Sequence, residues 1–396
     1  DSIVAISLVN HARREGLSIS PREVFQLRTA EALARAEAGR EVAAVDTDDI
    51  AFGAVAGTPI LARISEAGDE ITRFHQSVLV QTPLEFDEQC AREALSAVVE
   101  RHDALRARLV RGKRWTLSVP HWDPSSAPDV LRVVEVEGRM DQLLSERLDG
   151  ETEAALDRLD PDAGVMLQAV LFRAASGPGR LLLIGHHLVV DGVSWRIILE
   201  DLAQAGTALI SGAEPALAPV GTSLRRWSAL LEERAHTGSF DAELPFWKAV
   251  TSTPEQMLGS RPLDPAVDLA GQAETLTVAL SPEFTRPLLS AVPAAFSGSV
   301  NDVLLTAFAV AASRWRAGRR AEAVPGPVLL DLEGHGREED LVRTPGGPAV
   351  DLSRTVGWFT TVYPVAIDPG GADGDEALAS ALKAVKEQLR SIPGAG

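Results

Sequence analysis

The segment from residue 181 to residue 202 constrains the fold more than any other part of the chain. It opens with Leu181–Ile184, an uninterrupted apolar run that is typical of a strand buried on both faces. A second apolar run covers residues 165–172, and Ser-Gly-Pro-Gly between the two runs predicts a turn. We therefore expect a β-hairpin whose second strand ends at two adjacent histidines, His186 and His187.

The residues after this histidine pair predict a turn and then a helix. Asp191 and Gly192 come next, and from Val193 onward the apolar residues recur on one helical face. Adjacent residues of a strand point to opposite faces, so only one of the two histidines can face a given cavity. An isolated His-His pair is as often structural as functional, but this whole pattern favours an imidazole at the rim of a cleft.

Length and composition exclude several classes of protein. A chain of 396 residues suits two or three compact units. Its 38 basic and 56 acidic residues give a net charge of −18, which argues against a nucleic-acid partner. Cys90, the single cysteine, excludes a disulfide framework, and no apolar run approaches the ~20 residues that span a bilayer. With no secretory signal visible, we expect a cytoplasmic protein without a membrane partner.

The pattern His-His-x-x-x-Asp-Gly at residues 186–192 resembles the signature of the condensation-domain superfamily of nonribosomal peptide synthetases, which are relatives of chloramphenicol acetyltransferase. The longer string HHLVVDGVSWRI is more similar to the epimerization branch than to the branch that forms peptide bonds. This resemblance implies that His187 is catalytic and that Asp191 holds the loop by a salt bridge. His186 and Gly192 would support the site.

Three further strings carry the resemblance. The first, RHDALR from Arg101, resembles the family motif RHxxLR, whose arginine supports the catalytic loop; a solvated charged face is an equal alternative. The second, RTVGWFT, contains Trp358, which is as typical of a core as of a substrate wall. The third, EGHGRE, follows an apolar strand expected over Val328–Leu332, and its glycines permit a sharp turn and a close approach of the backbone to a ligand. Condensation domains lack EGHGRE, so this string favours a catalytic Glu333 over a solvated turn residue, with His335 and Arg337 as supporting residues.

The resemblance also implies a domain organisation. Residues 1–39 predict short helices with too few large apolar residues for an independent domain, and they resemble the C-terminal part of a peptidyl carrier domain. There Ser2 would carry 4′-phosphopantetheine. We expect a linker over 40–56, an N-terminal lobe over 57–235 and a C-terminal lobe, truncated at its end, over 236–396. The implied fold is α+β, with two chloramphenicol acetyltransferase-like lobes in a V-shaped pseudo-dimer.

Local patterns predict the other elements. These are a strand over Phe74–Val80, a helix from Cys90 to Leu109, a helix from Leu224 to Arg234, an alternating strand over Thr275–Leu280, and a nearly all-apolar, hence buried, helix from Ser299 to Trp315.

The candidate residues suit proton transfer at carbon. The Cα–H of a thioester-bound aminoacyl group is acidic because its carbonyl delocalises the carbanion as an enolate, and catalysis needs a base on one face and an acid on the other. Desolvation in a channel would raise the pKa of Glu333 toward neutrality and so make it a better base. His187 would donate to the enolate oxygen or act on the opposite face. Neither a metal nor PLP is expected: His186 and His187 diverge, and with His335 they make a poor zinc set without a nearby cysteine.

The resemblance thus implies an isomerase that interconverts the L and D configurations at the Cα of a carrier-bound aminoacyl or peptidyl thioester. Such D-amino acids belong to secondary metabolism, including antibiotic biosynthesis. The implied partners are the chain's own upstream carrier domain, an adenylation domain and a downstream condensation domain. The alternatives are a condensation domain that forms amides, which would leave EGHGRE unexplained, and a catalytically silent docking platform.

Overall fold

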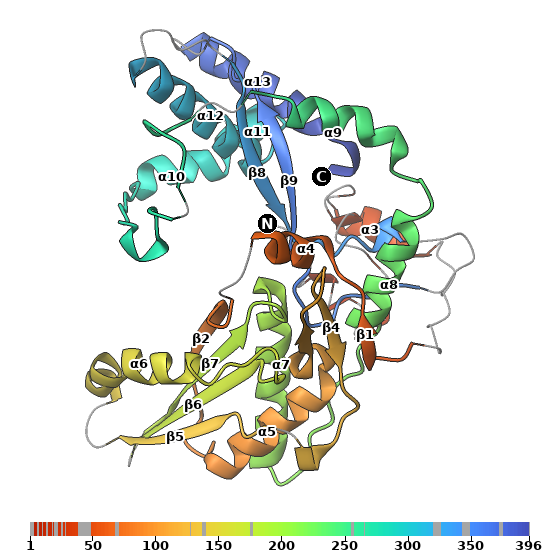
Figure 1. Cartoon of the computed structure of the whole chain (residues 1–396), viewed down its shortest axis with the longest axis vertical. Helices are drawn as coiled ribbons and strands as arrows, with labels where there is room; N and C mark the ends of the chain where they lie inside the picture. The colour runs from red at the N-terminus through yellow and green to blue at the C-terminus, as the bar shows by residue number, and fades with distance from the viewer. Residues whose placement is uncertain are drawn as a thin grey trace. The chain divides into compact units, whose positions relative to one another are not determined.

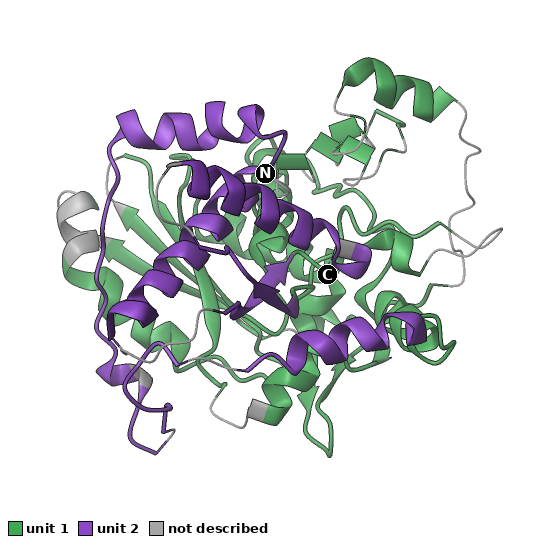
Figure 2. Ribbon diagram, turned by 90° about the horizontal axis from the view of Figure 1, so that it is seen from above, with its two compact units in different colours: residues 1–239, 335–361 green, residues 240–334, 362–396 purple. Residues whose placement is uncertain are grey.

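The structure is a computed structural model that describes residues 49–67, 71–126, 128–136, 140–174, 177–254, 257–264, 266–319, 326–342, 349–371 and 375–395, with parts of 4–38. The chain divides into two compact units, coloured separately in Figure 2. Unit 1 comprises residues 1–239 and 335–361, and unit 2 comprises 240–334 and 362–396. The lobe boundary expected at 235/236 stays a prediction. In the division into compact units, the chain leaves unit 1 after residue 239, and residues 335–361 belong to unit 1 again.

A four-stranded sheet forms the centre of unit 1, and it contains the predicted hairpin. Its order is β2-β7-β6-β5, in which only the β5–β6 pair is parallel. In the hairpin, Leu167 pairs with Gly185. The strands are β2 (His75–Gln81), β5 (Leu131–Val136), β6 (Leu167–Ala174) and β7 (Arg180–His186). Strand β7 is buried from Leu181 onward, as its uninterrupted apolar run predicts.

Helices cover this sheet (Figure 1). Helix α6 (Met140–Leu156) packs on one face, where its end joins a buried cluster with residues of β5, β6 and β7. Helices α5 (Glu88–Arg101) and α7 (Gly192–Ile210) pack against each other at the other side. The cluster under α6 comprises Val134, Ala155, Leu156, Leu159, Val170, Phe172, Leu182 and Ile184.

Helix α5 is shorter than predicted. It ends at Arg101 because His102 leaves the helical conformation, with φ −105° and ψ 96°. The imidazole of His102 is fully buried, and its Nε2 lies 2.8 Å from Oδ2 of Asp201 on α7. A 3₁₀ turn over Asp103–Arg106 follows, and then strand β3 (Arg108–Val110). This tertiary contact overrides the helical pattern that continues toward Leu109.

Unit 1 also contains a three-stranded sheet of order β1-β4-β3. Strand β1 lies within the expected linker, and Asp49 accepts hydrogen bonds from the backbone N and the Oγ of Ser223, at 2.7 and 2.6 Å. Helix α8 confirms the helix expected from Leu224. The remaining elements of unit 1 are β1 (Gly53–Val55), β3 (Arg108–Val110), β4 (Thr116–Val119), α3 (Ala30–Ala38), α4 (Pro59–Ala67) and α8 (Leu224–Ala235).

Unit 2 is built on a two-stranded sheet of β8 and β9, against which α12 and α13 pack. Its core comprises Ala309, Ala312, Val328, Val365, Ile367 and Val385. The elements are α9 (Leu244–Thr251), α10 (Pro282–Leu289), α11 (Ala291–Ala295), α12 (Val300–Arg319), β8 (Val328–Gly334), β9 (Thr361–Ile367) and α13 (Asp375–Arg390).

Two predictions for unit 2 are wrong. Thr275–Leu280 forms no strand, pairs with no strand among the described residues, and leaves Leu276 90% exposed. Alternation alone is insufficient, because a strand needs a neighbour for its backbone hydrogen bonds. Helix α12 exists, but Leu304 and Phe308 are about half exposed. Its apolar residues surround the helix, and the small sheet covers only one side.

In the described part of the chain, no single helix has the length and apolar character needed to cross a membrane. One pair bent by 107°, Pro282–Ala295 with Val300–Arg319, meets those criteria only when combined.

Candidate active site

The two adjacent histidines at the end of β7 have different environments, as strand geometry predicts. His186 is fully buried; its Nε2 donates to the carbonyl of Ile71 at 2.8 Å, and its Nδ1 accepts from the backbone N of Leu188 at 3.2 Å. Burial lowers the pKa of His186 to about 4, so this imidazole is neutral near pH 7. Both of its nitrogens are used by the backbone, so His186 is a structural residue.

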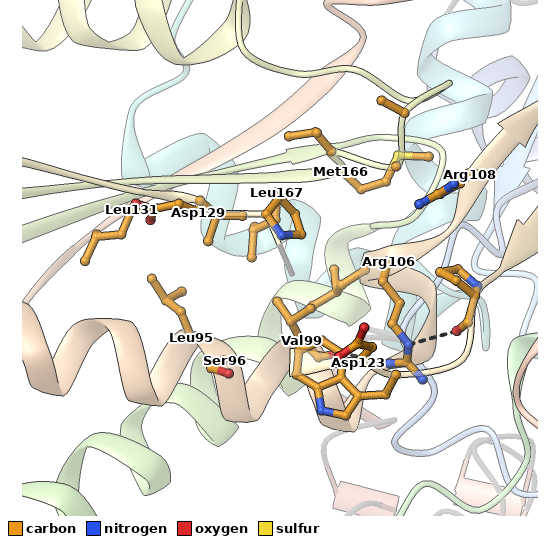
Figure 3. Close-up of a pocket in the computed structure, with 18 of the residues that line it drawn as sticks. Leu95, Ser96, Val99, Arg106, Arg108, Asp123, Asp129, Leu131, Met166 and Leu167 are labelled. Carbon is orange, nitrogen blue, oxygen red and sulfur yellow. Dashed lines mark hydrogen bonds between the residues drawn. The ribbon is translucent and has the colours of Figure 1, made fainter. Parts of the chain in front are cut away.

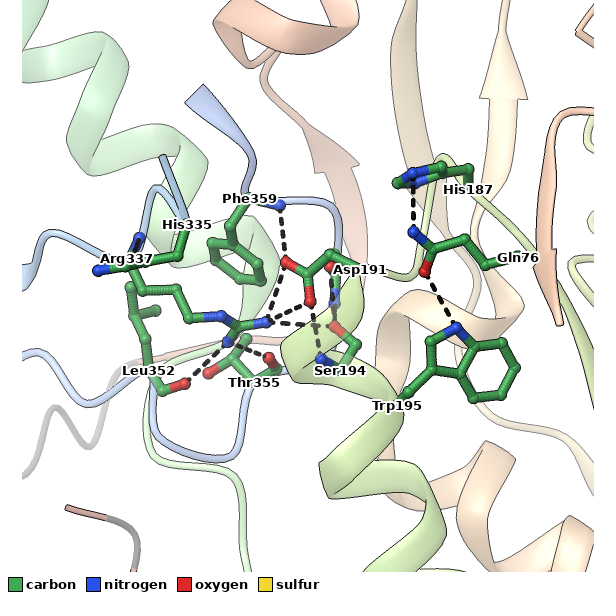
Figure 4. A network of polar contacts seen from close by, with 11 residues as sticks. Gln76, His187, Asp191, Ser194, Trp195, His335, Arg337, Leu352, Thr355 and Phe359 are labelled. Atoms are coloured by element: carbon green, nitrogen blue, oxygen red, sulfur yellow. Dashed lines mark hydrogen bonds and ion pairs between the residues drawn. The ribbon is translucent and has the colours of Figure 1, made fainter. Parts of the chain in front are cut away.

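His187 points into a different, aromatic environment. Its backbone N donates to the carbonyl of Phe74 at 2.8 Å, and its ring stacks on the ring of Phe74 with centroids 4.7 Å apart. The Trp358 ring lies 4.8 Å from the imidazole, centroid to centroid. The Nε2 atom is 3.0 Å from Nε2 of Gln76 (Figure 4), whereas Nδ1 is buried and has no hydrogen-bond partner among the described residues.

The sequence analysis did not identify Gln76 and Trp195, which form a hydrogen-bond chain to His187. Gln76, on β2, receives a hydrogen bond at its Oε1 from Nε1 of Trp195 at 3.0 Å (Figure 4). The Gln76 signal was weak, since one amide in a half-buried strand is ordinary. Trp195 stood within the motif string, but a tryptophan just inside a helix is usually a core residue.

Asp191 ends the loop and starts helix α7. Its Oδ1 accepts from the backbone N of Ser194 at 2.7 Å, which makes Asp191 the N-cap of α7. Both of its carboxylate oxygens contact Nη2 of Arg337, at 3.2 and 3.3 Å, and Oδ2 also accepts from the backbone N of Phe359 at 3.3 Å. The salt bridge that the resemblance implies for Asp191 is therefore present (Figure 4).

Arg337 fixes the segment 335–361 to this loop. Its side chain is buried, its Nη1 donates to the carbonyls of Leu352 and Thr355 at 3.0 and 2.6 Å, and its guanidinium lies 4.0 Å from the centroid of the Phe359 ring. Burial lowers the pKa of Arg337, and the Asp191 carboxylate opposes that shift. The pair thus depends on both partners, because either charge alone would be buried without compensation.

The string EGHGRE passes close to another backbone segment, while the approach to a ligand expected for its glycines stays a prediction. Gly336 has φ +66°, and a Cβ at this position would lie 1.6 Å from the carbonyl oxygen of Phe359. Only glycine fits there. His335, just before it, accepts from the backbone N of Arg337 at its Nδ1 (3.0 Å), and its Nε2 lies 3.4 Å from Glu338.

The supporting role predicted for Arg101 stays a prediction. Arg101 is the last residue of α5 and its side chain is exposed, while Arg337 pairs with Asp191. In the same RHDALR string His102 is buried, and its partner Asp201 also accepts from Nη2 of Arg354 at 2.5 and 2.6 Å. Burial by itself would raise the pKa of Asp201, but the hydrogen bonds from His102 and Arg354 lower it below its ordinary value.

The remaining predicted site residues are Glu333, Gly192, Ser2 and Trp358. Glu333 lies on β8 of unit 2 with an exposed side chain, so the structure does not show the desolvated carboxylate that was expected. That it faces His187 stays a prediction. Gly192 is the exposed first residue of α7, and Ser2 lies outside the described residues. Trp358 is buried against His187.

Unit 1 also contains a cavity of about 340 Å³, which is not lined by the loop that carries His187 (Figure 3). Its lining includes Leu95 and Val99 of α5, Leu131 of β5 and Leu167 of β6, with Arg106 at 3.4 Å from the Pro120 carbonyl. None of the predicted site residues lines this cavity. Within the described ranges, no group of three or more His, Cys, Asp or Glu side chains could hold a metal ion.

Comparisons with known proteins identify the family. Residues 63–395 match the condensation-domain model and residues 1–36 match the phosphopantetheine attachment site. The chain therefore belongs to the condensation-domain family of nonribosomal peptide synthetases. It is 34% identical to a linear gramicidin synthase protein of Brevibacillus parabrevis over 404 residues, and 36% identical to chondramide synthase cmdD of Chondromyces crocatus over 409. Both alignments cover the whole chain, but only 8% and 10% of those relatives.

Solved structures with this fold include an epimerization domain from the third module of tyrocidine synthetase B. It is 28% identical, with a TM-score of 0.70, and the alignment covers 89% of this chain and 74% of that one. The X-domain from teicoplanin biosynthesis has a TM-score of 0.66 at 20% identity, covering 86% of this chain and 71% of that chain. The latter similarity shows the fold alone. The α+β fold class predicted from the sequence is confirmed.

The attachment-site match means that the chain belongs with proteins that carry covalently bound phosphopantetheine. Ser2 lies within the matched range of residues 1–36. Because Ser2 is outside the described residues, attachment at its hydroxyl stays a prediction.

Proposed function

We propose that this chain epimerizes the Cα of a carrier-bound aminoacyl or peptidyl thioester. The observation that carries the proposal is the buried Arg337–Asp191 pair, because it joins EGHGRE directly to the loop that presents His187. Glu333 precedes His335 by two residues, so at most about 7 Å separates their Cα atoms. The 28% identity to an epimerization domain supports the same branch of the family.

The chemistry is a proton removal and return at carbon. Phosphopantetheine, when bound, supplies the thioester whose carbonyl acidifies the Cα–H. Glu333 takes the Cα proton, and the electron pair of the broken C–H bond moves to the carbonyl oxygen as an enolate, which His187 stabilises. A water molecule then gives a proton to the opposite face of Cα, which yields the other configuration, and Glu333 releases the proton that it took to solvent. Each well-placed acid or base group contributes ~10²–10⁴-fold to the rate.

The substitution Glu333→Gln tests the proposal, because it keeps the shape of the side chain and removes its titrating group. Carriers loaded with the L- or the D-aminoacyl group are incubated in deuterated water, and the D:L ratio and the Cα deuterium uptake are followed. We expect turnover to fall by about 10²-fold or more, with little change in KM, as for an interaction made mainly in the transition state.

Asp331→Asn is the matched control, since Asp331 is an exposed carboxylate two residues earlier on the same strand. It should keep the wild-type rate. If Glu333→Gln approaches equilibrium at the wild-type rate from both sides, Glu333 has no part in the reaction and the proposal is wrong.

Amide formation is the second candidate, because the family model that matches is that of the condensation domain. Supplying donor and acceptor carriers together separates the two functions: an amide product without Cα exchange identifies condensation. Under either function we propose the upstream carrier domain, an adenylation domain and a downstream condensation domain as partners in the cytoplasm.

A further inference from the structure

A hydrogen-bond chain from Trp195 through Gln76 to His187 has only one consistent arrangement of protons. The indole Nε1–H of Trp195 can only donate, so the Gln76 atom that it contacts at 3.0 Å must be the amide oxygen. The amide NH₂ of Gln76 then points at Nε2 of His187, 3.0 Å away. That NH₂ group can only donate, so Nε2 of His187 must offer a lone pair.

The tautomer of His187 follows from this arrangement. In a neutral imidazole one nitrogen donates and the other accepts, so a lone pair at Nε2 places the proton on Nδ1. We propose that Trp195 and Gln76 are positioning residues that hold His187 as its Nδ1–H tautomer, so that His187 meets the substrate as a hydrogen-bond donor and not as a base. The part concerning substrate rests on the proposed function; the tautomer does not.

The surroundings of the other ring nitrogen of His187, Nδ1, support this role. Its Nδ1 atom is buried and has no partner among the described residues, and the same holds for Nε1 of Trp358, whose ring centroid is 4.8 Å away. Buried donors without acceptors are costly and uncommon. Two such donors in one aromatic cluster, which also includes Phe74, suit an acceptor oxygen with two lone pairs. The carbonyl oxygen of a thioester, which gains charge as the enolate forms, has that chemistry.

This assignment gives the two proposed catalytic groups, His187 and Glu333, different roles. A neutral imidazole that donates from Nδ1 keeps its proton, because losing it would create an imidazolate. His187 would thus stabilise charge on oxygen, and proton transfer at Cα would require another group, for which Glu333 is the candidate. Loss of the Nδ1 donor should impair both directions of epimerization equally.

Nitrogen NMR of the ¹⁵N-histidine-labelled full chain tests the tautomer without any assay of activity. The chain has eight histidines, and the His187 signals are assigned by their loss in His187→Gln. We expect a protonated-type shift at Nδ1 and a lone-pair-type shift at Nε2 in the wild type. The reverse assignment in the wild type overturns the proposal, and this measurement depends on no variant that must retain activity.

Variants then test the cause. In Gln76→Glu the carboxylate accepts from both Trp195 and His187, so Nε2 of His187 should become protonated. Trp195→Phe removes the donor that fixes the amide, so both tautomers should appear. Gln81→Glu, the same change at the exposed far end of β2, should leave the His187 signals unchanged. An unaltered Nε2 signal in Gln76→Glu would show that Gln76 does not set the tautomer.

The catalytic part has its own measurement. Gln76→Leu frees Nε2 to carry the proton and should lower kcat by up to about 10²–10³-fold, the cost of one lost oxyanion donor, with KM nearly constant. An unchanged kcat would overturn the donor role. If the tautomer is as expected but neither wild type nor variant exchanges the Cα proton, the proposed function fails and the positioning by Gln76 stands.

Discussion

The loop at residues 186–192 and the end of strand β8 each supply a proposed catalytic group, yet the protein holds them in very different ways. Most of the loop is buried, with His187 half-buried and Gly192 exposed, and Asp191 and Arg337 are only 6% and 4% exposed. Strand β8 has only half-buried and exposed residues after Val328, and Glu333 is among the exposed ones. The histidine is therefore preorganised by packing and hydrogen bonds, whereas the carboxylate owes its place mainly to the strand that carries it.

Among these predictions, the substitution Arg337→Ala should have the largest effect, because it removes the charge that holds the buried loop. It leaves the Asp191 carboxylate buried without its cation, which typically costs about 3–5 kcal/mol in the free energy of unfolding. Urea denaturation of the variant and the wild type measures the difference. Arg101→Ala, at an exposed position, is the control and should change stability by less than about 0.5 kcal/mol. Equal losses in the two variants would mean that the buried pair does not hold the loop.

Acid should weaken the loop through His186. Its folded-state pKa of about 4 lies below the ordinary value of about 6.5. The unfolded chain therefore binds the proton more readily, and stability that is complete above pH 6.5 is lost as the pH falls toward 4, by at most about 3 kcal/mol. Asp103 opposes this trend, since burial raises its pKa to about 6.

The pH dependence of stability in the wild type thus combines opposing groups. The difference between the wild type and a His186 variant isolates the contribution of His186. We expect His186→Gln to lose less stability than the wild type between pH 6.5 and 4, whatever its stability at neutral pH. Guanidinium denaturation across this range gives both curves. Parallel curves would show that His186 does not titrate on unfolding in this window.

The smallest effect is expected at Glu333. Because its side chain is exposed, Glu333→Gln should change the free energy of unfolding by less than about 0.5 kcal/mol. The same variant is the one expected to lose turnover, so thermal or urea unfolding separates the two properties. A destabilisation above about 1 kcal/mol would place Glu333 in a buried network and would remove the contrast between the two regions.

Local sequence was sufficient for the elements that present the site. The apolar runs around the Ser-Gly-Pro-Gly turn predicted β6 and β7, and the Asp-Gly pair predicted the start of α7. Strand alternation predicted that His186 and His187 diverge. These features depend on backbone geometry within a few residues, which a periodic pattern encodes directly.

Only the tertiary structure decided which side chains meet. Arg337 and Asp191 are 146 residues apart and Gln76 and His187 are 111 apart, so no local pattern could pair them. Burial of His102 against Asp201 ended α5 early, and the missing neighbour of Thr275–Leu280 left it without a strand partner among the described residues. Such contacts are set by how distant elements pack, because desolvation and hydrogen-bond partners exist only once the chain has folded.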